Sequence, residues 1–332
     1  MLNFAVIGTG WITASFVTSA HATNKWQLRA VFSRKEDTAR DFAAKFTADA
    51  AIHTTLKSLA ADQSIAAVYI ASPNSLHFAH AKQLLEARKH VIVEKPATST
   101  SSELDTLFQT ARAHGVFLLE AFRHLHEVNF KVLKAALGRL GPVYGASLNY
   151  AAYSSRYDNV LRGETPNVFS LDHSGGALVD LGVYPIAAAV ALFGAPKAQQ
   201  YFPVIVRTGA DGGGVVVLQY EGFAVSANAS KIYTSTAPSE VYGEKGTLVI
   251  PSITDIASVR FLDARKKGES EELGKEKESL NLKEEADEFA RIIEEKDGKM
   301  AEELEKLSRA VLAVTEDLRR ANELKFKVEK EG

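Results

Sequence analysis

The feature that most constrains the fold of this chain is an alternation, over its first 120 residues, between short apolar runs and helix-length amphipathic stretches. Each run contains at least one β-branched residue and is apolar over most of its length. Strands of a parallel sheet have this character when helices cover both sides. The runs lie at 3–7, 28–32, 66–71, 90–94 and 116–120. The pattern predicts a doubly wound α/β domain, an arrangement typical of nucleotide-binding proteins.

The pattern changes near residue 121, and the rest of the chain predicts a second domain. Runs between about 199 and 262 have the alternation expected of an antiparallel or mixed sheet. A longer apolar stretch at 175–194 is expected to form a buried helix that Pro185 interrupts or bends. A chain of 332 residues usually organises more than one core, so we expect two domains, at 1–121 and 122–332.

Composition and charge exclude several classes of function. The formal net charge of −2 provides no basic field for nucleic acid. The chain has no cysteine, which excludes disulfides, thiolate nucleophiles, iron–sulfur clusters and cysteine zinc sites. The apolar N-terminus lacks the basic segment of a signal peptide, and no membrane-spanning run is expected. We therefore expect a cytoplasmic protein that binds neither nucleic acid nor a membrane.

A glycine-containing turn follows the first apolar run and indicates a dinucleotide site. The turn reads Gly8-Thr9-Gly10-Trp11-Ile12-Thr13 and opens a helix. Gly8 permits the tight turn, and Gly10 lets the backbone approach a pyrophosphate at the helix N-terminus, beside Trp11 and Ile12. Thr13 replaces the third glycine of the usual fingerprint. An ordinary strand–helix turn is the alternative, but the position after the first strand favours dinucleotide binding.

The end of the second run indicates which dinucleotide binds. An NAD enzyme usually carries Asp or Glu there, which accepts hydrogen bonds from the ribose 2′-hydroxyl. Here the run ends in Ser33-Arg34-Lys35, with no acid at its tip. This favours NADP(H), because the Arg34 guanidinium can bind a 2′-phosphate in a planar fork. Glu36 and Asp37 follow closely, and the two cations could instead open an exposed helix, so NAD(H) stays open.

Two further runs end in residues that suit a ligand site, because ligands of such sheets bind beyond the carboxyl ends of the strands. One run ends in Glu94-Lys95-Pro96 and another is followed by Ser72-Pro73-Asn74. A lysine is a strong proton donor only if desolvation or a nearby cation lowers its pKa. Pro96 can fix the turn that directs Lys95, and a cis bond there would be one way. A surface lysine paired with Glu94 is the alternative.

Three segments together resemble one known family. They are SPNSLHFAHA (72–81), ARKHVIVEKPAT (87–98) and GGALVDLGVYPI (175–186). The segments resemble the glucose–fructose oxidoreductase and inositol dehydrogenase family (Gfo/Idh/MocA), and the likeness covers nearly the whole chain. It implies a dinucleotide-binding Rossmann domain at 1–121 and an α/β domain at 122–332 with a large open sheet for substrate binding and oligomerisation. Because an exposed open sheet must be covered, we expect a homodimer, with a homotetramer as the alternative.

The resemblance implies catalytic roles for three residues. Lys95 matches the lysine that contacts the reacting oxygen or the catalytic acid, and Asp180 matches an aspartate that binds or orients the substrate. Tyr184 stands where inositol dehydrogenases carry histidine, which argues against an inositol substrate and is similar to the dihydrodiol and sugar dehydrogenase branch. On a helix, Asp180 and Tyr184 would share one face. Lys95 could then supply the charge that lets Tyr184 act as acid and base.

Other residues complete the expected site. The resemblance places four of them at the nicotinamide and its ribose: Ser72, Asn74, His77 and Glu94. Arg123, His126 and His173 are weaker candidates for contacts with the substrate, because a lone histidine is more often structural. The nine histidines and many acids show no metal-ligand spacing, so no metal is expected.

The sequence therefore predicts an NADP(H)-dependent dehydrogenase or reductase that acts on CH–OH groups. Its substrate would be a sugar, polyol, diol or related carbonyl compound. The alternative is a dinucleotide-sensing regulator that kept the fold and lost turnover, since a fold does not determine a function. The presence of Lys95, Asp180 and Tyr184 together argues against a regulator, which would need the cofactor pocket but no proton relay.

Overall fold

The computed structural model describes residues 1–266 and 268–330, and its internal contacts divide the chain into two units. The first unit contains 1–121 and 280–309, and the second contains 122–279 and the residues from Ala310 onward. Residues 280–309 thus lie in the first unit, although the sequence pattern placed them in the second domain. The physical reason is that the apolar face of this segment, with Phe289 and Ile292, completes the core of the first unit.

The first unit is built on a six-stranded parallel sheet with the order β3-β2-β1-β4-β5-β6. This order confirms the predicted doubly wound arrangement. The third strand is short and follows a polar stretch, which is why its run was missed. The strands are β1 (Leu2–Ile7), β2 (Trp26–Phe32), β3 (Ala51–His53), β4 (Ala67–Ile70), β5 (His90–Glu94) and β6 (Leu118–Ala121).

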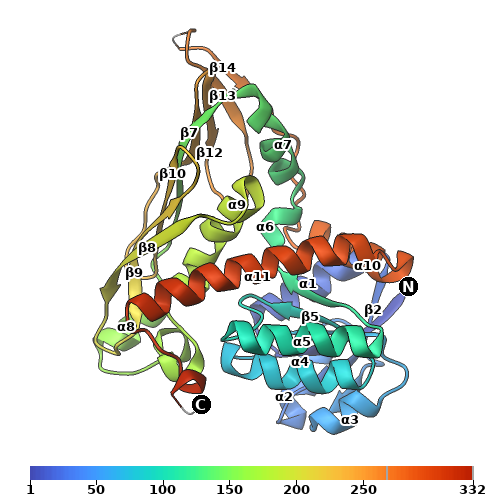
Figure 1. Ribbon diagram of the computed structural model, residues 1–332. Helices are drawn as coiled ribbons and strands as arrows, with labels where there is room; N and C mark the ends of the chain where they lie inside the picture. Colours follow the sequence, from blue (N-terminus) through green and yellow to red (C-terminus); the bar gives the residue numbers. More distant parts are fainter. Residues whose placement is uncertain (267, 331–332) are drawn as a thin grey trace. The chain divides into compact units, whose positions relative to one another are not determined.

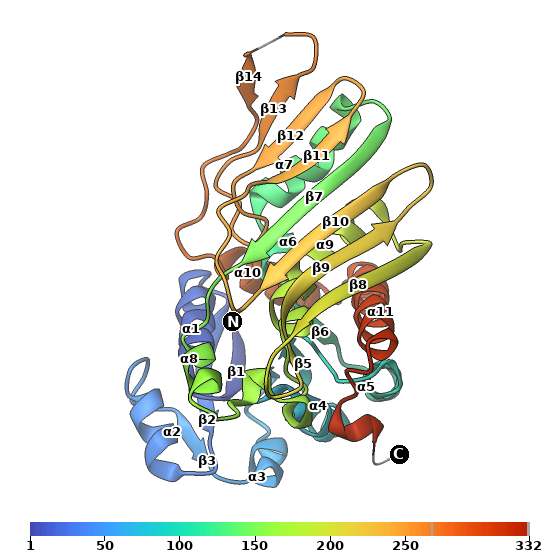
Figure 2. The same ribbon diagram turned by 90° about the vertical axis from the view of Figure 1, so that its left-hand side faces the viewer.

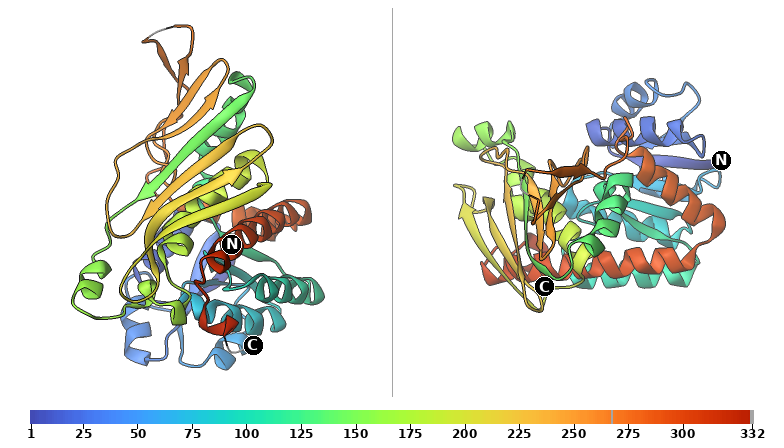
Figure 3. Two further views of the ribbon diagram at one scale, coloured as in Figure 1. Left: turned by 60° about the vertical axis from the view of Figure 1, so that its left-hand side comes forward. Right: turned by 90° about the horizontal axis from the view of Figure 1, so that it is seen from above.

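Helices cover both faces of this sheet, as Figures 1 and 3 show for α4 and α5 on one side and α1 on the other. Local signals set their ends: Thr100 accepts the Glu103 N–H at the start of α5, and Gly115 ends it in the left-handed region. The helices of this unit are α1 (Trp11–Ala22), α2 (Glu36–Ala43), α3 (Leu56–Ala61), α4 (His77–Glu86), α5 (Ser101–His114) and α10 (Lys283–Glu295).

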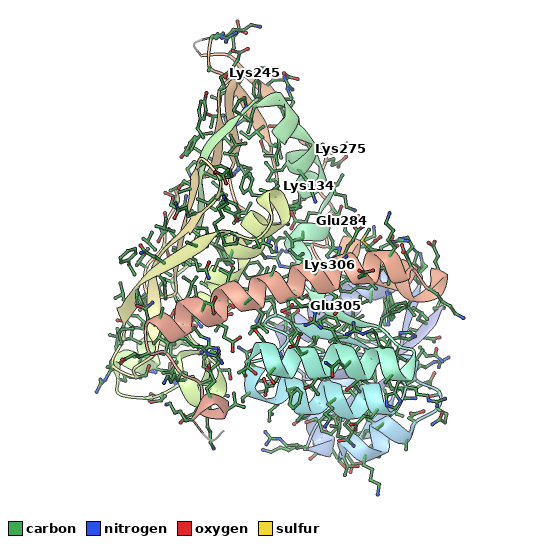
Figure 4. All side chains as sticks on the ribbon, in the orientation of Figure 1. Lys134, Lys245, Lys275, Glu284, Glu305 and Lys306 are labelled. Carbon is green, nitrogen blue, oxygen red and sulfur yellow. The ribbon has the colours of Figure 1, made fainter. Side chains whose placement is uncertain are left out.

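The C-terminal helices are tied to the first unit by polar contacts as well as by burial. The buried Trp26 indole donates to the Ala286 carbonyl of α10 at 2.8 Å. In α11 (Gly298–Ala321), Glu305 pairs with Arg112 of α5 at 2.7 Å, and Figure 4 labels Glu305 and its neighbour Lys306. A cavity of about 770 Å³ lies between α5 and α11, but it contains none of the predicted site residues.

The second unit contains an eight-stranded mixed sheet with the order β14-β13-β12-β11-β7-β10-β9-β8, seen from one face in Figure 2. β10 runs parallel to β7 and the other pairs are antiparallel, which confirms the predicted mixed sheet. The strands are β7 (Val143–Ala151), β8 (Ala198–Ile205), β9 (Asp211–Gln219), β10 (Ala224–Ser230), β11 (Ser239–Gly243), β12 (Gly246–Ile250), β13 (Arg260–Asp263) and β14 (Ser270–Glu272). Its main helices are α6 (Arg123–His126), α7 (Val128–Ala136), α8 (Arg156–Leu161) and α9 (Val183–Phe193).

The long apolar stretch forms the central helix of the second unit. Leu178–Gly182 is π-helical and continues into α9, within which Pro185 lies. A proline has no N–H to bond the carbonyl four residues earlier, and a wider turn before it accommodates that loss. Contrary to expectation, Leu171–Phe193 is long and apolar enough to span a membrane, with a mean hydropathy of 1.8. Its most apolar window is 72% buried, as is usual for a core helix.

Candidate active site

The turn between β1 and α1 has the geometry that a pyrophosphate site requires. Gly8 has a φ of +103°, and a Cβ there would lie 2.5 Å from the Ala71 carbonyl oxygen, so only glycine fits. Gly10 precedes the first turn of α1, and no protein atom comes within 4 Å of the place a Cβ would take. That first turn carries no acidic side chain. The open backbone and the positive end of the helix suit a phosphate group.

The other residues of this turn differ in their exposure. Trp11 is 78% exposed, whereas Ile12 packs partly against the core. Thr13 is fully buried where the third fingerprint glycine would stand, and its Oγ1 has no hydrogen-bond partner among the described residues. Ile12 and Thr13 thus face the protein interior, while the Trp11 side chain lies in solvent.

A cavity of about 290 Å³ lies beyond the carboxyl ends of β1, β2 and β4. Gly8, Ser33, Arg34 and Ser72 line it, so four of the residues predicted to bind the cofactor meet there. Arg34 is exposed and makes no hydrogen bond or ion pair with any described residue. Its acidic neighbour Glu36 is paired with Arg40 along α2 instead. These residues fit NADP(H), with Arg34 available for the 2′-phosphate.

His80 of α4 also lines this cavity, and sequence reasoning missed it. Its Nδ1 and the Ser72 Oγ are hydrogen-bonded at 3.1 Å. The signal in the sequence was its spacing, one helical turn after His77 in the segment that follows Ser72. A histidine at helical spacing is common in any helix, so this signal alone could not distinguish a cavity wall from a solvent face.

The strand end that carries Lys95 is held by buried contacts. The Lys95–Pro96 peptide bond is cis, as the sequence suggested. Glu94 accepts a 2.5 Å hydrogen bond from the Tyr69 hydroxyl, and the Tyr69 ring stacks on Phe16 of α1 at 3.8 Å between centroids. Glu94 is therefore linked through β4 to the helix that follows the glycine turn.

His77 joins the loop after β4 to the turn after β5. It is 1% exposed, and its ring nitrogens lie 2.9 Å from the Pro96 carbonyl oxygen and 2.8 Å from that of Ser72. Burial lowers the pKa of His77 to about 4. A neutral imidazole has one N–H, so only one of the two carbonyls receives a hydrogen bond at a time. Asn74 begins the short 3₁₀ turn before His77 and is half-buried.

A buried carboxyl group, Glu120, supports the same turn and was not predicted. It is 7% exposed at the end of β6 and accepts the Ala97 N–H at 2.7 Å. Burial raises the pKa of Glu120 to about 7, while hydrogen bonds from Ser308 and Ala97 oppose the rise. Lys95 also opposes the rise in pKa, so Glu120 and Lys95 interact electrostatically. The signal in the sequence was an acid inside the apolar run at 116–120.

In the second unit, Asp180 has a partner that the sequence did not reveal. The Lys231 ammonium, on a side chain 3% exposed, lies 2.5 Å from the Asp180 carboxylate. Lys231 also donates to the Val168 carbonyl at 3.0 Å and lies 4.7 Å from the centre of the Phe169 ring. Asp180 itself is 31% exposed. The pair therefore presents a carboxylate whose position is fixed from the buried side.

Tyr184 lies among aromatic and cationic groups of the same unit. The rings of His124 and Tyr150 pack edge-on against it, with centroids at 5.0 and 5.4 Å. His124 Nε2 donates to the Tyr184 carbonyl at 3.1 Å, which fixes the backbone here. The Arg123 guanidinium lies 5.9 Å from the centre of the Tyr184 ring.

Arg123 is the cation of this cluster. Burial would lower its pKa, but Tyr184, Glu127 and Asp255 together raise it. The attraction is mutual, so the guanidinium favours the ionised form of Tyr184. Glu127 is buried 3.6 Å from Arg123, and burial raises the pKa of Glu127 to about 7. Sequence reasoning assigned the charge beside Tyr184 to Lys95, whereas Arg123 supplies one from within the same unit.

The two weaker histidine candidates lie in different surroundings. His126 is 6% exposed on α6, and His173 is exposed in the short 3₁₀ turn Leu171–His173. Neither stands in a cluster of the kind that binds a metal ion: within 1–266 and 268–330, no three such side chains converge.

A Rossmann unit with an open glycine turn, followed by a second unit with an acid, a tyrosine and a cation, defines a dinucleotide-dependent oxidoreductase. The family comparison agrees. Residues 2–122 match the model of the oxidoreductase family with an NAD-binding Rossmann fold, and residues 134–249 match the GFO/IDH/MocA C-terminal domain. The chain belongs to the Gfo/Idh/MocA family, as its motifs predicted.

Individual proteins of known sequence or structure are also similar to this chain. The chain is 43% identical over 262 residues to the uncharacterised oxidoreductase YgjR of Escherichia coli, covering 79% of this chain and 80% of that one. It is also 43% identical over 267 residues to the NADP(+)-dependent scyllo-inositol 2-dehydrogenase IolU of Bacillus subtilis, covering 80% and 81%. The 3-ketoreductase KijD10 of Actinomadura kijaniata, crystallised with NADP and TDP-benzene, has the same fold, with a TM-score of 0.82, 23% identity and coverage of 96% and 97%.

The chain is an NADP(H)-dependent oxidoreductase that acts on hydroxyl or carbonyl groups of small molecules of the sugar, polyol and diol kind. This confirms the predicted enzyme class, the predicted cofactor and the predicted kind of reaction. Tyr184 does not by itself argue against an inositol substrate, because a relative with 43% identity is named as an inositol dehydrogenase.

Proposed function

We propose that the enzyme interconverts a secondary alcohol of a cyclic polyol, or of a sugar in its ring form, and the corresponding ketone or lactone. The observation that carries this proposal is the fixed Asp180 carboxylate four residues before Tyr184. A carboxylate that is 31% exposed can accept hydrogen bonds from neighbouring hydroxyl groups, which a polyol offers and a simple alcohol does not. The activity in the name of the IolU relative is of this kind.

In this proposal, Tyr184 moves the proton of the reacting hydroxyl group. Arg123 stabilises its phenolate, which is required before a tyrosine can take a proton near neutral pH. Lys95, at the carboxyl end of β5, would donate a hydrogen bond to the reacting oxygen and favour the alkoxide as it forms. NADP⁺, when bound, supplies the hydride acceptor. In the reverse direction Tyr184 returns the proton to the new alkoxide.

In this proposal, each unit would bind a different ligand. The first, with Gly8, Gly10, Ser33 and Arg34, would bind the cofactor. The second would bind the substrate, with Asp180 as its orienting group and Lys231 holding that carboxylate in position through their 2.5 Å contact. Arg123 and His173 are further candidates to contact the substrate, whereas His126 is buried on α6.

We further propose that a second copy of the chain covers the open face of the eight-stranded sheet. Phe202 on edge strand β8 is 60% exposed, and its neighbour across the ladder, Val215, is 41% exposed. Apolar side chains in register on an edge favour association with another sheet. A homodimer is the simplest such assembly and a homotetramer the next. A cytoplasmic enzyme without nucleic-acid or membrane partners is consistent with the charge and composition.

The test is absorbance at the nicotinamide band, with NADP⁺ and a panel of inositols, aldoses and vicinal diols. Lys95→Ala and Tyr184→Phe should each lower kcat roughly 10²–10⁴-fold on an accepted substrate. Lys134→Ala and Tyr220→Phe, in which the same residue types are changed elsewhere, should keep the wild-type rate. Turnover that survives both Lys95→Ala and Tyr184→Phe would refute the proposed proton relay.

A further inference from the structure

His80 lines the cofactor cavity, yet the function above gives it no task. The ring is half-buried and packs edge-on against Phe32, with centroids 6.1 Å apart at 74°. Its Nδ1 is hydrogen-bonded to Ser72 Oγ. These two contacts fix the imidazole at the wall of the cavity. No described residue forms a hydrogen bond with the other nitrogen, Nε2.

The electrostatic surroundings of His80 favour an anion. Burial lowers the pKa of His80, and the Arg34 guanidinium lowers it further. His77 is the other titratable group that interacts with it. No carboxylate lines the cavity, which Arg34 and His80 share. Two groups that can both be cationic, with no acid between them, repel each other until an anion binds.

We propose that His80 is a specificity-determining residue for NADP(H): Nε2 donates to the 2′-phosphate opposite Arg34, and the ring takes up one proton from solvent when that phosphate binds. The cofactor class is established for this enzyme, so the proposal does not depend on the roles of Lys95, Asp180 and Tyr184. It adds a third recognition group to Ser33 and Arg34, and this group is contributed by helix α4.

The consequence is a pH dependence that one dinucleotide shows and the other does not. A phosphate dianion beside His80 stabilises the imidazolium, so the complex binds more protons than the free protein in the pH range of histidine titration. The affinity for NADPH therefore falls as the pH rises through this range. NADH has a hydroxyl group at this position, and its affinity should not follow His80.

The experiment is equilibrium binding of NADPH and of NADH, followed by the fluorescence of the reduced nicotinamide between about pH 6 and about pH 8.5. For the wild-type protein, we expect the dissociation constant of NADPH to rise about tenfold across this range, because a charge-assisted hydrogen bond is lost. His80→Phe keeps an aromatic ring beside Phe32 and removes the nitrogens. It should weaken NADPH binding about tenfold at the acid end and flatten the profile.

Two matched variants make the result decisive. His80→Gln retains a hydrogen-bond donor that cannot titrate, so it should flatten the pH profile with a smaller loss of affinity. Leu76→Ala changes an apolar wall of the same cavity and should affect both dinucleotides alike. The proposal is overturned if His80→Phe and His80→Gln keep the wild-type pH profile for NADPH. An equal loss for NADH and NADPH in His80→Phe, folded as judged by circular dichroism, would also overturn it.

Discussion

The two sheets of this protein use their faces differently. In the first unit, β4 is buried along its whole length and β1 along its last four residues, because helices cover both sides. In the second unit, only Tyr201 of β8 is buried, and Phe202, Val204 and Ile205 of the same strand are exposed. All side chains of a strand that is buried on both sides pack in the core, so none of them can contact a ligand. The first sheet therefore carries its polar groups at the strand ends.

This difference separates the expected effects of substitutions. Changes at the strand ends of the first sheet should affect cofactor binding and stability together, because those turns lie against the core. Changes on the open face of the second sheet should alter assembly and leave the fold of the unit intact. We expect the chemistry of the second unit to depend instead on Asp180 and Tyr184 of the helix at 178–193, and on Lys231, the buried cation that pairs with Asp180.

The largest effect is expected at the first strand end. Gly8→Ala would place a Cβ 2.5 Å from the Ala71 carbonyl oxygen at a φ of +103°. We expect a loss of roughly 4 kcal/mol in the free energy of unfolding, from backbone strain plus steric overlap. Gly10→Ala is the control, because its Cβ meets open space. Urea unfolding should show stability within about 0.5 kcal/mol of wild type for Gly10→Ala, with weaker NADPH binding. Equal stability of both variants would show that the turn is not constrained by the sheet.

The next effect concerns Glu120, the buried acid at the end of β6 in the first sheet, and the dependence of stability on pH. Its pKa is raised to about 7 by burial, above the ordinary value of 4.5 that applies in the unfolded chain. The folded protein therefore holds a proton that the unfolded chain releases as the pH rises from 4.5 to 7, and stability is lost over this range. The loss is roughly 3 kcal/mol for that interval.

Glu120→Gln cannot ionise but keeps an oxygen that can accept the Ala97 N–H. Its stability relative to wild type should therefore increase between about pH 5 and about pH 8, as measured by urea unfolding at each pH. A constant difference between the two proteins at all pH values would contradict the raised pKa of Glu120.

Lys231 tests the second unit. Lys231→Met removes the cation beside Asp180 and keeps an apolar chain of similar length at the same buried position. We expect a loss of about 2 kcal/mol in stability, less than for a fully buried pair because Asp180 is 31% exposed, and a fall in activity of about 100-fold. Lys197→Met is the control, since Lys197 pairs with exposed Glu221 and should change neither property. If Lys231→Met behaved like Lys197→Met, Asp180 would not depend on its buried partner.

The smallest change in stability is expected on the open face. Phe202→Asp places a charge at a 60% exposed position on edge strand β8. The stability of the unit should change by less than about 0.5 kcal/mol, because little buried contact is lost. Light scattering should show a protein of lower mass than the wild type. Unchanged mass in Phe202→Asp would exclude this face as the contact between copies.

Much of the first unit could be predicted from local signals. The apolar runs predicted five of its six strands to within two residues, and the turn residues Gly8 and Gly10 lie where the pattern placed them. The short strand β3 has a run of only three residues, too few for a periodic signal. The segment 280–309 could not be assigned to the first unit from the sequence, because the apolar stripe of an amphipathic helix fits any core and only the packing of Phe289 selects one.

In the candidate site too, residues in local motifs could be predicted, whereas residues that depend on contacts between distant segments could not. Lys95, Asp180 and Tyr184 belong to motifs, so the sequence named them. Lys231 is 51 residues from Asp180, and Glu120 is 23 residues from Ala97, so each pair depends on how distant segments meet. Single lysines and glutamates of this kind carry no local signal, and His80 is one of nine histidines without a distinguishing motif.

The discontinuous first unit limits how this enzyme can be recombined with its relatives. A fragment that ended at residue 121 would lack α10, so the Trp26 indole would lose its acceptor at Ala286 and the apolar face of α1 would be uncovered. An exchange of substrate-binding parts therefore has to leave 280–309 with its own Rossmann sheet. The junctions fall after 121, after 279 and after 309, and the last of these cuts through the middle of α11. At the junction after 309, chimaeras of this family should be joined within a helical turn whose sequence both parents share, so that α11 continues without a break.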